Sequence, residues 1–201
     1  MNVRVLVDFA SAASYLAIEP ARALESRVGA TFQWLPFHGP ALTLTEPAEA
    51  TTDRGTKHRR LRAQYIARDL QRYAEARGLH LTDVHRKVDA GPASLALLWL
   101  NRCAPERAGD FVERVFQRVW RHNEPADAAF LENALGEFGS GFRDYRAGDA
   151  ARDLQRVRDE ATEIGVWISP AFVVGDEPFI GRQHLPIVEW LLAGQKGPPP
   201  I

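Results

Sequence analysis

The chain has 201 residues, 45% of them hydrophobic and 25% charged, and a formal net charge of -1. Such a composition is ordinary for a globular protein and excludes a disordered or fibrous chain. The near balance of charge gives no general attraction to phosphate backbones, so nucleic acid is not expected as a partner. No apolar run approaches the roughly 20 residues of a membrane span, and the start lacks a signal-peptide pattern, so we expect a cytoplasmic protein that does not bind membranes.

Cys103 is the only cysteine of the sequence. One thiol can form neither an intrachain disulfide nor a CxxC redox site, and the scattered histidines lack metal-ligand spacing, so we predict no metal site and no dithiol exchange. Because Cys103 ends the apolar segment 95–102, we expect a small core side chain there rather than a nucleophile.

The first elements predict a βαβ unit. Val3 to Phe9 is an apolar, β-branched run, Ala12 to Arg27 has helical spacing and is closed by Gly29, and Thr31 to Phe37 is again a strand pattern. A strand, a helix and a second strand in this order imply a parallel pair joined by a right-handed crossover.

A long loop and a block of helices follow the βαβ unit. Residues 39–55 are rich in proline, threonine and small side chains and predict a loop that could act as a lid. Helices are predicted for 56–77, 93–100, 111–120, 126–138 and 149–164. After Gly165, the segments 171–174 and 178–180 around a Gly175-Asp176 turn predict a hairpin, and 184–192 a last helix.

Ser11 stands between the first strand and the first helix. Its hydroxyl and the free N–H groups of the helix start can point at the same place, which favours a negative atom. One interpretation is an N-cap that stabilises the helix by about 1 kcal/mol. The other is a hydroxyl that donates to the thiolate of a bound thiol, while the positive helix end lowers the pKa of that thiol.

Two further positions lie at predicted strand ends. Pro170 precedes the apolar strand that starts at Ala171, where a cis Ser169-Pro170 bond is one option that sequence alone does not decide. His38 follows the second strand, where sheet ends often line a cleft; a surface or core histidine is the alternative.

Three segments carry a family resemblance. VDFASAASYLA at 7–17 resembles the DFxSPYSYLA start of the 2-hydroxychromene-2-carboxylate isomerase and kappa-class glutathione transferase group, and residues 65–72 resemble its YxxxDLxR helix. GVWISPAFVVGDEPFIGRQHL at 165–185 is similar to the family pattern GVxGVPTFVVDGExFWGQDRL. The resemblance implies an α/β thioredoxin fold of the DsbA-like type, βαβ plus ββα, with an inserted all-helical subdomain. Residues 1–40 and 165–195, with part of 149–164, would form the thioredoxin-like domain, and 56–148 the insertion.

The resemblance also implies glutathione as the cofactor and a small molecule as the substrate. Ser11 would stabilise the glutathione thiolate as the catalytic residue, with Ser14 in the place of the second DsbA cysteine, and Ser169 before a cis-proline would pair with the cysteinyl backbone. The residues expected to contact the tripeptide are Ser14, Phe37, Arg62, Ser169, Pro170, Arg182, Gln183 and His184. A homodimer is one option for the assembly, since family members are commonly dimers.

The sequence departs from the family pattern at three places. Arg62 replaces a lysine, Gln183-His184 replaces an aspartate-arginine pair, and Ala12-Ala13 replaces proline-tyrosine. A glutamine offers only a neutral acceptor to an ammonium group, which loses the charge-assisted part of the bond. Two functions follow: a glutathione-dependent isomerase or transferase for a conjugated hydrophobic substrate, or a redox-inactive DsbA-like binding protein without catalysis.

Overall fold

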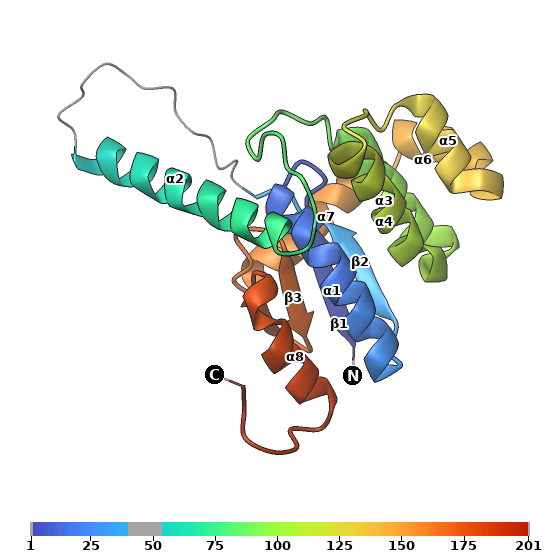
Figure 1. Cartoon of the computed structure of the whole chain (residues 1–201). Helices are drawn as coiled ribbons and strands as arrows, with labels where there is room; N and C mark the ends of the chain where they lie inside the picture. Colours follow the sequence, from blue (N-terminus) through green and yellow to red (C-terminus); the bar gives the residue numbers. More distant parts are fainter. Residues whose placement is uncertain (1, 40–53, 201) are drawn as a thin grey trace.

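The computed structural model describes residues 2–39 and 54–200 and has a thioredoxin-like α/β fold (Figure 1). Its mixed four-stranded sheet has the order β2-β1-β3-β4. The strands are β1 (Val3–Val7), β2 (Phe32–Pro36), β3 (Ala171–Val174) and β4 (Glu177–Ile180). β1 pairs parallel with β2 and antiparallel with β3, which confirms the predicted βαβ unit and the later hairpin.

Helix α1 (Ala12–Val28) joins the parallel pair; it begins at the predicted residue and ends one residue later than predicted. Ser11 caps its start, and Gly29 ends it with a φ of 62°, a conformation that glycine adopts at little cost. β1 is shorter than expected because the chain turns after Val7, where the Ser11 N–H donates to the Asp8 carbonyl oxygen.

Helices cover both faces of the sheet. Side chains of successive strand residues point to opposite faces. Leu35 shares a hollow with Leu98 of α3 (Gly91–Cys103) and Val157 of α7 (Ala150–Glu163), whereas the neighbouring Trp34 lies against Gly109 of α4 (Ala108–Phe116). α1 contacts both α4 and the last helix, α8 (Leu185–Leu192). The largest fully buried side chains, which include Trp34, Phe9, Phe32, Phe116 and Phe172, form one core.

All regular elements described between β2 and β3 are helices. α2 (Arg54–Glu75) projects from the body, while α5 (Ala128–Leu135) and α6 (Gly139–Ala147) lie at the opposite side of the molecule (Figure 1). α4 continues as the wider turn η2 (Gln117–Arg121). The domain boundaries drawn from the resemblance stay a prediction, and the loop expected over 39–55 lies almost wholly outside the described residues.

Helix α6 was not expected from the sequence. Gly139 and Gly141 weaken its helical signal, and only Phe142 and Tyr145 of its side chains are buried. None of the helices in the described ranges is long and apolar enough to cross a membrane.

Candidate active site

Four strand ends meet at one edge of the sheet. The pairs Val7↔Pro36, Leu6↔Ala171 and Ala171↔Ile180 place the carboxyl ends of β1, β2 and β4 beside the start of β3. The segments 8–11, 37–39, 168–170 and 181–184 therefore lie at this edge, which we call the site edge. Most of the residues selected from the sequence belong to these segments.

Ser11 is the N-cap of α1. Its Oγ accepts a hydrogen bond of 3.2 Å from the Ser14 N–H, with Ser11 in extended conformation. An N-cap uses a lone pair of the hydroxyl and leaves the hydroxyl hydrogen free. Within residues 2–39 and 54–200 no acceptor takes that hydrogen. The cap is thus confirmed, and it is compatible with a donor role toward a bound anion.

Ser14 lies on the inner side of the same turn. Its side chain is fully buried, and its Oγ accepts a 3.2 Å hydrogen bond from the Asp8 N–H. The hydroxyl ties the end of β1 to the first turn of α1. A contact of Ser14 with glutathione stays a prediction, and the observed role is to hold the turn that presents Ser11.

Ser169 and Pro170 stand where β3 begins, joined by a cis peptide bond. Ser169 is 5% exposed, yet in the described part of the chain its main-chain N–H and C=O make no hydrogen bond. Buried backbone groups are nearly always paired, so this pair fits the backbone of an extended peptide ligand. Gly39 lies against this segment, because a Cβ on it would approach Ile168 Cα at 3.0 Å.

The turn η4 (Arg182–His184) follows β4 and contacts α1. The Arg182 guanidinium lies over the ring of Tyr73 in α2, and burial lowers the pKa of Arg182. Gln183 is exposed and its Nε2 donates to the Ile180 carbonyl oxygen at 2.9 Å, while the exposed His184 lies beside Phe179. Arg182 is the only lysine or arginine of this turn and so supplies its permanent positive charge.

Phe37 and Arg62 differ in how they relate to the site edge. Phe37 is buried, and its N–H donates to the Val7 carbonyl oxygen at 2.8 Å, so it extends the strand pairing. Arg62 is exposed on the projecting helix α2, and no described hydrogen bond or ion pair joins it to the other selected residues. A role for either residue in ligand binding stays a prediction.

Sequence reasoning missed a chain of hydrogen bonds beside Ser11. His38 Nδ1 lies 3.1 Å from Asp8 Oδ1, and His38 Nε2 lies 3.1 Å from Ser94 Oγ in α3. Asp8 Oδ1 also accepts the Ala10 N–H at 2.9 Å. The position of His38 at a strand end signalled a cleft residue, but no local pattern could indicate Ser94, which is 56 residues away.

Trp120 makes a second contact between two parts of the chain, the helical segment (residues 54–163) and the corner between β1 and α1 (residues 8–11). Its Nε1 donates to the buried Phe9 carbonyl oxygen at 2.9 Å. Its ring also stacks with Tyr15 and contacts the Arg86 guanidinium. The wider turn η2 brings Trp120 into this position. The apolar stripe of 111–120 predicted burial for Trp120 but gave no sign of its partner.

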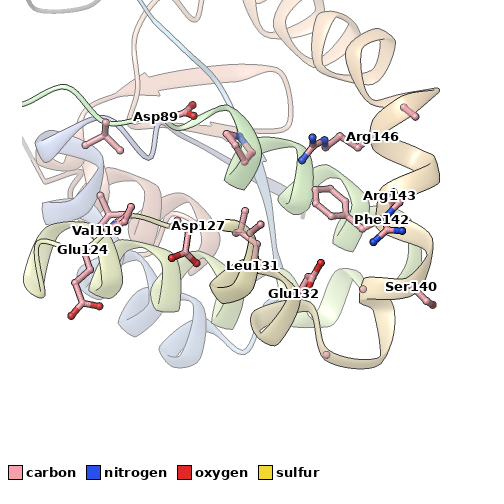
Figure 2. A pocket seen from close by; sticks show the side chains of 18 of the residues that line it. Asp89, Val119, Glu124, Asp127, Leu131, Glu132, Ser140, Phe142, Arg143 and Arg146 are labelled. Atoms are coloured by element: carbon pink, nitrogen blue, oxygen red, sulfur yellow. The ribbon is translucent and has the colours of Figure 1, made fainter.

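Figure 2 shows a separate hollow of about 1320 Å³ between α3, α5 and α6. Its wall mixes acidic side chains such as Asp127 and Glu132 with the basic Arg143 and Arg146, over an apolar floor that includes Leu131 and Phe142. No residue selected from the sequence lines it. The hollow therefore belongs to the helical segment rather than to the site edge.

A family model decides the classification. The DSBA-like thioredoxin domain matches residues 2–193. The chain is a member of the DsbA-like thioredoxin family. Curated proteins give no match to this DsbA-like protein.

Solved structures share the fold of this DsbA-like protein at low identity. A 2-hydroxychromene-2-carboxylate isomerase is 22% identical, with a TM-score of 0.73 and coverage of 97% of this chain and 96% of that one. The cytosolic disulfide reductase DsbM from Pseudomonas aeruginosa, a structure with GSH, is 16% identical over 98% of both chains, with a TM-score of 0.65. A probable DsbA oxidoreductase from Streptomyces coelicolor is 18% identical over 100% and 93%, with a TM-score of 0.65.

The prediction that Cys103 is a core side chain is wrong. Cys103 is exposed, not part of the core, because the last turn of α3 directs it outward, and its Sγ donates to the Trp99 carbonyl oxygen at 3.2 Å. Partial burial of the sulfur raises the pKa of Cys103, which disfavours a reactive thiolate. In the described ranges no three His, Cys, Asp or Glu side chains form a potential metal site.

Proposed function

We propose that this DsbA-like protein is a glutathione-dependent isomerase or transferase that acts on a conjugated hydrophobic substrate. The observation that carries the proposal is Ser11, a capping serine with a free hydroxyl hydrogen at the positive end of α1. Such a group stabilises an anion at the helix N-terminus without being a nucleophile itself. The single, exposed Cys103 supplies no alternative thiol chemistry at this edge.

The unpaired main chain of Ser169 supports the choice of a peptide-like thiol. A bound cysteinyl residue offers one N–H and one C=O, which match the free C=O and N–H of Ser169. Arg182 on the neighbouring turn would attract a carboxylate of the tripeptide. These three groups come from segments that the sheet register places at the same edge.

When bound, glutathione would supply a thiolate that adds to a conjugated carbon of the substrate. In this proposal the Ser11 O–H donates to the sulfur and thereby favours its ionised form. The Ser169 backbone orients the cysteinyl unit. In the isomerase option the new C–S bond breaks again and glutathione is recovered. In the transferase option the C–S bond stays in the product and another group of the substrate leaves.

Thermal unfolding with and without millimolar reduced glutathione tests the proposal. A ligand at 100 times its Kd adds about 2.7 kcal/mol. For a chain of this size we expect the midpoint to rise by about 5–10 °C. The absence of any shift at the highest accessible concentration would exclude a glutathione site.

Substitutions at Ser11 separate the cap from the thiolate donor. Ser11→Asp keeps a good cap but places a like charge beside the sulfur, so stability without ligand is retained and the glutathione shift is lost. Ser11→Thr keeps both functions, whereas Ser11→Ala loses about 1 kcal/mol of stability and most of the shift. Ser140→Ala, at an exposed serine of α6, is the matched control and changes neither quantity.

Gln183 favours a second candidate, a binding protein without catalysis. Its amide is turned back onto Ile180, and as a neutral acceptor it holds an ammonium group more weakly than a carboxylate does. Conjugation of glutathione to 1-chloro-2,4-dinitrobenzene distinguishes the two candidates. Turnover lost in Ser11→Asp supports the enzyme, whereas glutathione binding without turnover on this and a panel of conjugated enones supports the binding protein.

A further inference from the structure

The hydrogen-bond chain Asp8, His38 and Ser94 can hold the imidazole in two protonation states. The Ser94 hydroxyl lies 3.1 Å from His38 Nε2 and 2.8 Å from the Ala90 carbonyl oxygen. If the hydroxyl donates to Nε2, His38 is neutral, with Nδ1–H on Asp8. If it donates to Ala90, His38 is a cation that donates from both nitrogens. Neither state leaves a polar atom of the ring unpaired.

The atoms follow the order of a catalytic triad, but Ser94 cannot serve as a nucleophile. Its side chain is completely buried in the first turn of α3. A hydroxyl without access to solvent cannot attack a substrate. His38 differs, since its side chain is 35% exposed and can exchange protons with water.

The carboxylate of Asp8 is hydrogen-bonded within the turn 8–11, which leads directly to Ser11, where the proposed thiolate would be held. Its Oδ1 accepts the Ala10 N–H, and its carbonyl oxygen accepts the Ser11 N–H at 2.9 Å. The side chain is only 15% exposed, so solvent screens its charge weakly. With neutral His38, Asp8 therefore opposes the ionisation of a thiol at Ser11, because like charges disfavour each other.

We propose that His38 controls the ionisation of the thiol bound at Ser11. As a cation, His38 neutralises the Asp8 carboxylate, and the thiol can then lose its proton. The inference rests on the proposed glutathione site and adds the residue that controls the charge of its sulfur. His38 acts through Asp8 and does not touch the reacting atoms.

The proton balance of this step is simple. The S–H bond of the thiol breaks, and its proton leaves to water. Water delivers one proton to His38 Nε2, and the Ser94 hydroxyl turns from Nε2 to the Ala90 carbonyl oxygen. The pair of thiol and neutral imidazole becomes thiolate and imidazolium, with no change in total charge.

Two other cations lie near this corner, but both are held by other partners: the Arg182 guanidinium lies over the Tyr73 ring, and the Arg86 guanidinium lies over the Trp120 ring. The first turn of α1 holds no acidic side chain, and the segment 166–170 that lies against Gly39 has no titratable group. Before α3, Asp89 is turned onto the Gly91 N–H at 3.2 Å. Asp8 is thus the charged group that His38 contacts directly.

The ultraviolet absorbance of the thiolate, measured as bound glutathione is titrated with alkali, tests the inference. His38→Gln keeps a donor for Asp8 but carries no charge, so we expect the thiolate fraction at pH 7 to fall about tenfold. Asp8→Asn removes the negative charge beside the sulfur, so we expect the thiolate fraction at pH 7 to rise. The double variant returns to within about twofold of the parent, which a loss of structure at either position would not produce.

Nuclear magnetic resonance of the unmutated protein gives an independent readout. Coupling between two sites is reciprocal, so glutathione must move the midpoint of the His38 ring titration to higher pH. S-methylglutathione, whose sulfur cannot ionise, must leave this midpoint in place. The resonance is assigned from its absence in His38→Gln, with His80→Gln as the control at an exposed histidine.

The outcomes separate the inference from the proposed function. If glutathione binds but its thiolate fraction is equal in the parent and His38→Gln, or the His38 midpoint does not move, the inference is overturned and the glutathione site stands. If neither glutathione nor S-methylglutathione binds the parent, both are overturned. Opposite changes in the two single variants, with recovery in the double variant, support the inference.

Discussion

Trp120→Phe tests whether the helical segment holds the corner that presents Ser11. Trp120 is 5% exposed and its Nε1 donates to the Phe9 carbonyl oxygen at 2.9 Å. Phenylalanine leaves this buried acceptor unpaired, which costs about 1–3 kcal/mol. It is also roughly 40 Å³ smaller, and about 24 cal/mol per Å³ of cavity adds about 1 kcal/mol. We expect a loss of about 3 kcal/mol in the free energy of unfolding.

Urea unfolding at pH 7 measures this loss, and thermal unfolding should show a midpoint lower by about 6–12 °C. Trp190→Phe is the matched control, because Trp190 Nε1 donates to the Gly197 carbonyl oxygen at 3.0 Å in a solvent-exposed bond. That variant should lose less than about 1 kcal/mol. Equal losses in the two variants, or a loss below about 1 kcal/mol for Trp120→Phe, would refute the reasoning.

Two further predictions concern α6 and the single cysteine. Gly141→Ala should lower the free energy of unfolding by about 1–3 kcal/mol, because the new Cβ would lie 2.6 Å from the Trp99 ring. Gly148→Ala, measured in the same urea titration, should change the free energy of unfolding very little. Equal unfolding midpoints for the two variants would contradict the predicted clash with Trp99. Partial burial raises the pKa of Cys103, so less of it is thiolate at a given pH and iodoacetamide should alkylate it at pH 7 more slowly than free N-acetylcysteine. The difference should shrink once the pH exceeds the raised pKa. Mass spectrometry follows the alkylation, and a rate at pH 7 as fast as that of N-acetylcysteine would contradict the raised pKa.

The parts of the fold that depend on local sequence could be predicted. The β-branched run before Ser11 and the capping position of that serine follow from short-range preferences, and both are present. The cleft position suggested for His38 rests on strand polarity alone, which is also local information. The prediction failed where local signals conflict. The glycines of α6 weaken its helical pattern, but the burial of Phe142 and Tyr145 in the core stabilises the helix.

The contacts that shape the corner could not be found in the sequence. His38 and Ser94 are 56 residues apart, and Phe9 and Trp120 are 111 apart. No periodicity encodes which histidine meets which serine, because that depends on how α3 and η2 pack against the strand ends. The family resemblance identified short segments of the sequence but not these pairs. In each pair, one residue lies at a strand end and the other in the helical segment.

Ser14 explains why a shared fold does not bring shared redox chemistry. A dithiol needs a second sulfur that can attack a mixed disulfide at the first position. The side chain at position 14 is fully buried, and its hydroxyl holds the Asp8 N–H. The same bond positions Asp8 and, through it, His38. In this chain the second position therefore holds the turn between Asp8 and Ser11, and under the proposed function the thiol that ionises at Ser11 belongs to the ligand.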